Sequence, residues 1–121
     1  ALVALGSMVK TAETVHAALK EEGIPASLIN ARFAKPLDTQ MLMEAASKHT
    51  LIVTMEENVI NGGFGEHITR FYNEQGIYVN VLNIAIPDEY VEHGNVDILY
   101  HEVCIDADTI LKRIKEVYHP L

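Results

Sequence analysis

Apolar residues occur along this chain in two alternating patterns. Short unbroken runs, such as Ala1–Leu5, are typical of strands buried on both faces. Other segments carry apolar residues three or four positions apart, which is typical of helices with one buried face. Gly, Pro, Asn and Asp separate the two kinds of segment. The pattern predicts strands at residues 1–5, 26–30, 50–55 and 78–86.

Each predicted strand is followed by a predicted helix. Ser7, Asp38 and Asp106 are the expected N-caps, because short oxygen-bearing side chains accept hydrogen bonds from the first free N–H groups of a helix. Gly23 and Gly76 are expected to end the first and third helices. The predicted helices lie within residues 7–23, 38–48, 62–76, 95–100 and 106–118. The buried face of the first is expected to comprise Met8, Ala12, Val15 and Leu19.

This alternation of strands and helices predicts an α/β fold. Parallel strands need crossover connections, which helices supply, so we expect a three-layer α/β/α open sheet that is mostly parallel. The 121 residues suffice for one buried core, and no repeat or linker interrupts them. We therefore expect residues 1–121 to form a single domain.

Composition and charge narrow the possible functions. The chain has 49% hydrophobic and 21% charged residues, and no stretch of 18 apolar residues, as in a folded protein without membrane spans. A net charge of −8 argues against nucleic acid or anionic membranes as partners. The lone Cys104 excludes an internal disulfide and fits a reducing cytoplasm, which is the compartment we expect.

The first residues indicate a piece of a longer polypeptide. Ala1–Leu5 is apolar but lacks an initiating Met, a basic leading region and a signal-cleavage site. An autonomous domain would usually start with a polar lead-in. We therefore expect further domains to precede this one.

An acidic doublet before a glycine-rich turn is the most informative local feature. Glu56-Glu57 follows the third predicted strand, and Gly62-Gly63-Phe64-Gly65 opens the next helix. N–H groups at a helix start can bind an anion, but the chain lacks the Lys-Ser/Thr of a P-loop, and the two carboxylates would repel phosphate. Close packing of the helix on a strand or on another domain is the favoured interpretation. Adjacent strand residues point to opposite faces, so the two carboxylates are expected to have different partners.

Two basic residues follow the neighbouring strand. Arg32 and Lys35 are expected at the same carboxyl edge of the sheet as the acidic doublet. We predict that Arg32 pairs with Glu56 or Glu57 and fixes the two loops. Replacing Arg32 with Met would then cost several kcal/mol, and an unchanged melting temperature would contradict the pairing.

No constellation for catalysis or metal binding is evident. The six histidines form no compact ligand pattern, and the lone Cys104 rules out a multi-Cys zinc site. Ser7 after Gly6 is interpreted as a helix cap, because the Gly-x-Ser-x-Gly pattern of a nucleophile is absent. The sequence therefore predicts no catalytic, cofactor-binding or metal-binding residue in this chain.

Four strings, in this order and spacing, carry a resemblance to a known family. They are Leu5-Gly-Ser-Met-Val9, Asn30-Ala-Arg-Phe-Ala-Lys-Pro-Leu-Asp38, Glu56-Glu-Asn-Val-Ile-Asn-Gly-Gly-Phe-Gly65 and Ile86-Pro-Asp-Glu-Tyr-Val-Glu-His-Gly94. Together they resemble the carboxyl-terminal domain of the 1-deoxy-D-xylulose-5-phosphate synthases, thiamine-diphosphate enzymes of the transketolase superfamily. Lys35-Pro-Leu-Asp38 and the Glu-Glu…Gly-Gly-Phe-Gly element of the third string are shared more widely in that superfamily, including transketolases and 2-oxoacid dehydrogenase beta subunits. The longer form Arg32-Phe-Ala-Lys-Pro-Leu-Asp38 and the Pro-Asp…Glu-His-Gly form of the fourth string resemble the synthases.

The resemblance implies a parent homodimer that uses thiamine diphosphate and Mg²⁺. Such an enzyme decarboxylates pyruvate and joins the two-carbon fragment to glyceraldehyde 3-phosphate, for isoprenoid, thiamine and pyridoxal synthesis. The family's cofactor motif and activating Glu lie in two preceding domains, so the isolated domain is expected to be inactive. The family's third domain also has a five-stranded sheet with one antiparallel edge strand, which the four predicted strands here do not include.

The resemblance also implies a docking edge for the rest of the enzyme. The carboxyl ends of parallel strands gather at one edge of a sheet, where partner and ligand contacts concentrate. Two alternatives remain: the domain of a 2-oxoacid dehydrogenase beta subunit that binds an acyltransferase, and a stand-alone binding module. The candidate interface or structural residues are Arg32, Lys35, Glu56, Glu57, Asn58, Gly62, Gly63, Gly65 and His93.

Overall fold

A computed structural model describes five stretches of the chain. They are residues 1–6, 8–31, 39–59, 63–86 and 106–118, and for 57–59 and 86 only the backbone is described. The predictions for Ser7, Asp38 and the helix at 95–100 lie outside these residues.

The described strands form one parallel sheet. They are β1 (Leu2–Leu5), β2 (Leu28–Ala31), β3 (Leu51–Val59) and β4 (Asn80–Ile86), in the order β2-β1-β3-β4. All three neighbouring pairs are parallel. An antiparallel edge strand is not found among the described residues.

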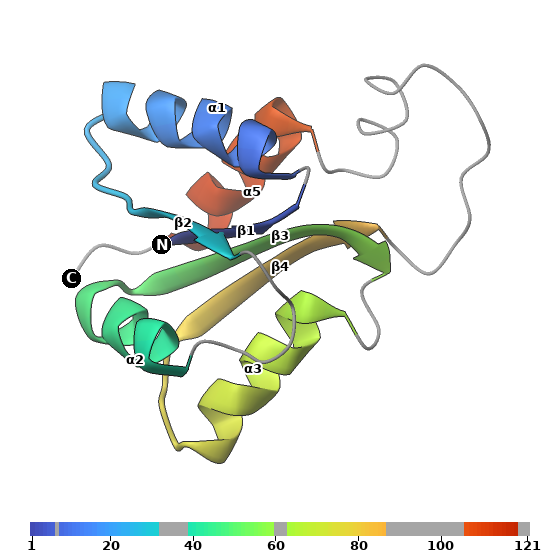
Figure 1. Ribbon diagram of the computed structural model, residues 1–121. Helices are drawn as coiled ribbons and strands as arrows, with labels where there is room; N and C mark the ends of the chain where they lie inside the picture. Colours follow the sequence, from blue (N-terminus) through green and yellow to red (C-terminus); the bar gives the residue numbers. More distant parts are fainter. Residues whose placement is uncertain (7, 32–38, 60–62, 87–105, 119–121) are drawn as a thin grey trace.

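Helices cover both faces of the sheet. They are α1 (Met8–Glu21), α2 (Thr39–Lys48), α3 (Phe64–Glu74) and α5 (Ala107–Val117). Helices α1 and α5 lie on one side, and α2 and α3 lie on the other (Figure 1). The predicted three-layer α/β/α sandwich is therefore confirmed.

The sheet separates two apolar cores. Alternate residues of each strand enter opposite cores, because side chains along a strand point to alternate faces. The core beneath α1 and α5 includes Leu2, Ala4, Met8, Ala12, Val15, Leu19, Val53, Met55, Ile84, Ile110 and Ile114. The core beneath α2 and α3 includes Val3, Ala31, Leu42, Ala45, Ile52, Phe64, Ile68 and Tyr72.

Tyr72 closes the second core with a polar contact. Its ring is 1% exposed, and its hydroxyl donates to the carbonyl of Leu42 in α2 at 2.7 Å. Burial raises the pKa of this phenol to about 12. The contact ties α3 to α2 without leaving a buried donor unpaired.

Helix ends follow the predicted signals where they are described. Asp106 is the N-cap of α5, and its side chain accepts from the N–H of Thr109. Gly23 and Gly76 have φ of 74° and 69°, a left-handed conformation that glycine adopts without the strain a side chain would add. Each glycine lies two residues after the last residue of a helix, where the sequence predicted the helix to end.

Strand boundaries differ from the prediction by up to four residues, and the differences at the end of β3 and the start of β4 have identifiable causes. Strand β3 continues past Met55 to Val59, with an irregular register against β4 between those two residues. Such an irregularity admits extra residues without ending the pairing, so the acidic doublet lies within the strand. Strand β4 begins at Asn80, because the chain is still leaving α3 at Ile77, whose N–H donates to the carbonyl of Tyr72.

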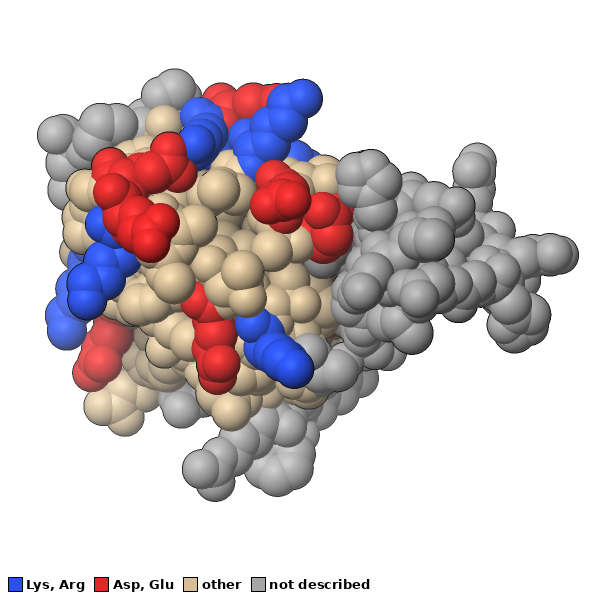
Figure 2. All heavy atoms as spheres, turned by 90° about the horizontal axis from the view of Figure 1, so that it is seen from above, with Lys and Arg blue, Asp and Glu red and all other residues tan. Residues whose placement is uncertain are grey.

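Charged residues of both signs share the outer face of the α1–α5 layer. Figure 2 shows Lys and Arg interspersed with Asp and Glu on this face. An ion pair links α5 to the residue that follows α1: Lys115 Nζ lies 2.5 Å from Glu22 Oε1, and both side chains are partly exposed. Screening by water keeps such a pair weak, so the apolar core holds the layer together.

Candidate functional site at the carboxyl edge of the sheet

Glu56 is a buried carboxylate near the carboxyl end of β3. Glu56 as a whole residue is 1% exposed. Ile52 belongs to the core beneath α2 and α3, and alternation along the strand places Thr54 and Glu56 on the same face. Glu56 therefore points toward the start of α3.

Both oxygens of this carboxylate accept from the first N–H groups of α3. Oε1 lies 2.7 Å from the nitrogen of Phe64, and Oε2 lies 2.5 Å from the nitrogen of Gly65. The first N–H groups of a helix have no partners within the helix and carry its positive dipole end, so they suit a negative charge. The anion at this glycine-rich helix start is thus the protein's own side chain.

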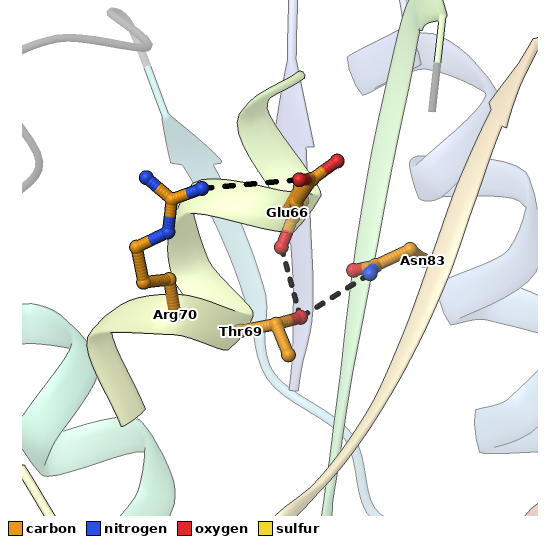
Figure 3. A network of polar contacts seen from close by, with 5 residues as sticks. Glu66, Thr69, Arg70 and Asn83 are labelled. Atoms are coloured by element: carbon orange, nitrogen blue, oxygen red, sulfur yellow. Dashed lines mark hydrogen bonds and ion pairs between the residues drawn. The ribbon is translucent and has the colours of Figure 1, made fainter. Parts of the chain in front are cut away.

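A second set of polar contacts joins the sheet to the same helix. Thr54 in β3 is fully buried, and its hydroxyl donates to Asn83 Oδ1 in β4 at 2.7 Å. The amide of Asn83 donates to the hydroxyl of Thr69 at 3.2 Å, and Thr69 donates to the carbonyl of Gly65 at 3.0 Å. Figure 3 shows Asn83 and Thr69 pointing toward each other between sheet and helix.

Gly65 allows α3 to approach this polar set. A Cβ at residue 65 would lie 2.6 Å from Asn83 Oδ1 and would also collide with Thr54 Oγ1. These distances are shorter than van der Waals contact, so a larger residue would displace the helix or break the hydrogen bonds. The close packing of helix on strand that the sequence favoured for this glycine is what the structure has.

An ion pair lies on the solvent side of α3, near the start of the helix. Arg70 Nη2 lies 3.9 Å from Glu66 Oε1, and both side chains are largely exposed (Figure 3). A pair of this kind at positions i and i+4 contributes a few tenths of a kcal/mol, roughly. The buried contacts therefore decide where α3 begins.

The structure brings together some of the predicted residues. Gly63 is the N-cap of α3, and Gly65 lies in its first turn. Glu57 and Asn58 belong to β3, where only their backbone is described. The predicted residues outside the described ranges are Arg32, Lys35, Gly62 and His93.

The predicted pairing of Arg32 stays a prediction, because Arg32 lies outside the described residues. Glu56 accepts from two backbone N–H groups, and this partner was not anticipated. Sequence reasoning also missed Thr54, Thr69 and Asn83. Polar residues within the apolar runs Leu51–Met55 and Val81–Ile84 were the available signal, since a buried polar side chain needs a partner.

Cavities lie at the opposite, amino edge of the sheet. One of about 340 Å³ is lined by residues that include Leu19, Ile24, Leu51 and Tyr118. Another of about 490 Å³ is lined by residues that include Ala46, Asn73 and Tyr78. Within the described ranges, no cluster of three potential metal ligands is found, and no helix there is long and apolar enough to cross a membrane.

A comparison with known protein families identifies the family of this chain. Residues 1–110 match the family described as "Transketolase, C-terminal domain". The chain belongs to this family.

Individual relatives show which members of the family this chain resembles. A 1-deoxy-D-xylulose-5-phosphate synthase of Lachnoclostridium phytofermentans is 49% identical over 117 residues, which is 94% of this chain and 18% of that protein. The synthase of Caldanaerobacter subterraneus subsp. tengcongensis is 41% identical over 121 residues, covering 97% of this chain and 20% of the relative. The sequence resemblance to the carboxyl-terminal region of these synthases is therefore confirmed, and the chain spans about a fifth of their length.

A solved structure agrees with the fold. The chain described as "Split gene transketolase, inactive beta4 tetramer" superposes with a TM-score of 0.85 at 26% identity. The match covers 95% of this chain and 36% of that one. The sandwich described above is thus the carboxyl-terminal domain fold of transketolases.

Proposed function

We propose that this chain is the carboxyl-terminal domain of a thiamine-diphosphate-dependent 1-deoxy-D-xylulose-5-phosphate synthase. The parent would form 1-deoxy-D-xylulose 5-phosphate and CO₂ from pyruvate and glyceraldehyde 3-phosphate, with Mg²⁺ and as a cytoplasmic homodimer. The observation that carries this proposal is the 49% identity to one such synthase over 94% of the chain.

Within that enzyme, the domain would serve assembly and not chemistry. The polar groups described above are engaged in holding α3 on the sheet: Glu56 with backbone N–H groups, and Thr54 with Asn83. Groups fixed in this way shape a surface, whereas a general acid or base needs access to a substrate. We therefore assign thiamine diphosphate, Mg²⁺ and the catalytic residues to the preceding domains, and expect the isolated domain to be inactive.

The docking face would be the carboxyl edge of the sheet. In open α/β sheets, contacts with ligands and partners concentrate at this edge. Strand β3 and the start of α3 meet there, and the candidates Glu57 and Gly63 belong to these two elements. Partners of this edge would be the preceding domains and, through them, the second subunit.

Variants of the complete protein test this assignment. Glu57→Gln and Gly63→Ala are expected to lower the dimer fraction, measured by light scattering, or the rate of product formation. Glu74→Gln is the matched control, because Glu74 is exposed at the far end of α3. Unchanged assembly and turnover in both edge variants would contradict the docking role, and binding of an acyltransferase subunit would favour a 2-oxoacid dehydrogenase.

A further inference from the structure

We infer that Glu56 is the positioning residue for the start of α3, and that its carboxylate supplies from within the chain the anion that this helix start would otherwise attract. The inference rests on contacts inside the chain and holds whichever enzyme contains the domain. Glu56 of the acidic doublet and the glycine-rich turn together fix the start of α3.

The cap of α3 is incomplete without Glu56. The N-cap residue is Gly63, which has an extended backbone and no side chain to accept the free N–H groups. In most helices a Ser, Thr, Asp or Asn at this position satisfies one such group. Here Glu56, eight and nine residues before its two partners, satisfies two.

Burial makes it costly to separate Glu56 from its two N–H partners. Glu56 is 1% exposed, and Phe64 and Gly65 are buried beside it. A buried carboxylate is costly without partners, and buried N–H groups are costly without acceptors. When the carboxylate accepts from these N–H groups, both costs are avoided and two charge-assisted hydrogen bonds form.

The helix start is tied to the sheet at a second point. The contacts from Thr54 through Asn83 and Thr69 end on the carbonyl of Gly65, whose N–H is held by Glu56. The N–H of Gly65 is therefore held by Glu56 of β3, and its carbonyl accepts from Thr69 of α3, which Asn83 links to β4. Glu56 fixes the direction in which α3 leaves the sheet, and the Thr54–Asn83 contacts fix its distance.

Chemical rescue of a truncated variant tests the inference in the 121-residue chain. Glu56→Ala removes the carboxylate, and its melting temperature is expected to fall by roughly 10 °C. Sodium acetate, compared with sodium chloride at the same ionic strength, should recover a substantial part of that loss, because acetate can enter the vacated position. Glu74→Ala on the same helix is the control, and acetate should change its melting temperature no more than that of the unmodified chain. Equal effects of acetate on both variants would overturn the inference.

Amide resonances provide a readout that does not depend on stability. Glu56→Gln keeps the size of the side chain but removes its charge, so the amide protons of Phe64 and Gly65 should move upfield. In Glu74→Gln these two resonances should stay in place. If Glu56→Ala fails to fold even with acetate, the Gln variant decides, and shifts no larger than those in the control would overturn the inference.

Discussion

At the scale of single residues, the atoms packed around Gly65 explain why this position is a glycine. Its backbone has no positive φ, so conformational freedom does not explain the glycine. The reason is space, because a Cβ would contact Asn83 Oδ1 at 2.6 Å and overlap Thr54 Oγ1. The glycine-rich turn predicted close packing but not the partner, since Asn83 lies on a strand that follows α3.

Gly65→Ala is expected to lower the free energy of unfolding by roughly 1–3 kcal/mol, the range for overpacking a tight interior. Urea denaturation monitored by circular dichroism measures the change. In a Thr54→Ala background the same substitution should cost less, because one of the colliding atoms is gone. Additive effects of the two substitutions would contradict the proposed collision.

At the scale of elements, predictions that depended on local pattern were accurate. The buried face of α1 comprises the four predicted residues, because helical spacing alone decides which side chains face the sheet. The end of β3 was placed too early, because acidic residues normally mark exposed turns. Burial of Glu56 depends on N–H groups eight and nine positions further along, which periodicity does not reveal.

The cap of α5 offers a test of a local interaction. Asp106→Ala removes the acceptor for the N–H of Thr109 and should lower the free energy of unfolding by about 1 kcal/mol. Asp106→Asn should cost less, because Asn caps helices about as well as Asp. Asp108→Ala, an exposed change in the first turn of the same helix, is the control. Thermal denaturation that ranks Asp108→Ala as the most damaging of the three would argue against the cap.

At the scale of the whole molecule, the sheet has two unlike edges. Among the described residues, Glu56 joins β3 to the start of α3 at the carboxyl edge, and two cavities lie at the amino edge. The fold class followed from the order of elements, and membership of the transketolase family followed from four strings of residues.

The central claim is that this domain completes a 1-deoxy-D-xylulose-5-phosphate synthase. Its most direct test is to express the complete reading frame that encodes these residues and to measure formation of 1-deoxy-D-xylulose 5-phosphate from pyruvate and glyceraldehyde 3-phosphate. We expect the complete protein to form this product only when thiamine diphosphate and Mg²⁺ are present. A folded, cofactor-loaded protein that releases no such product would contradict it.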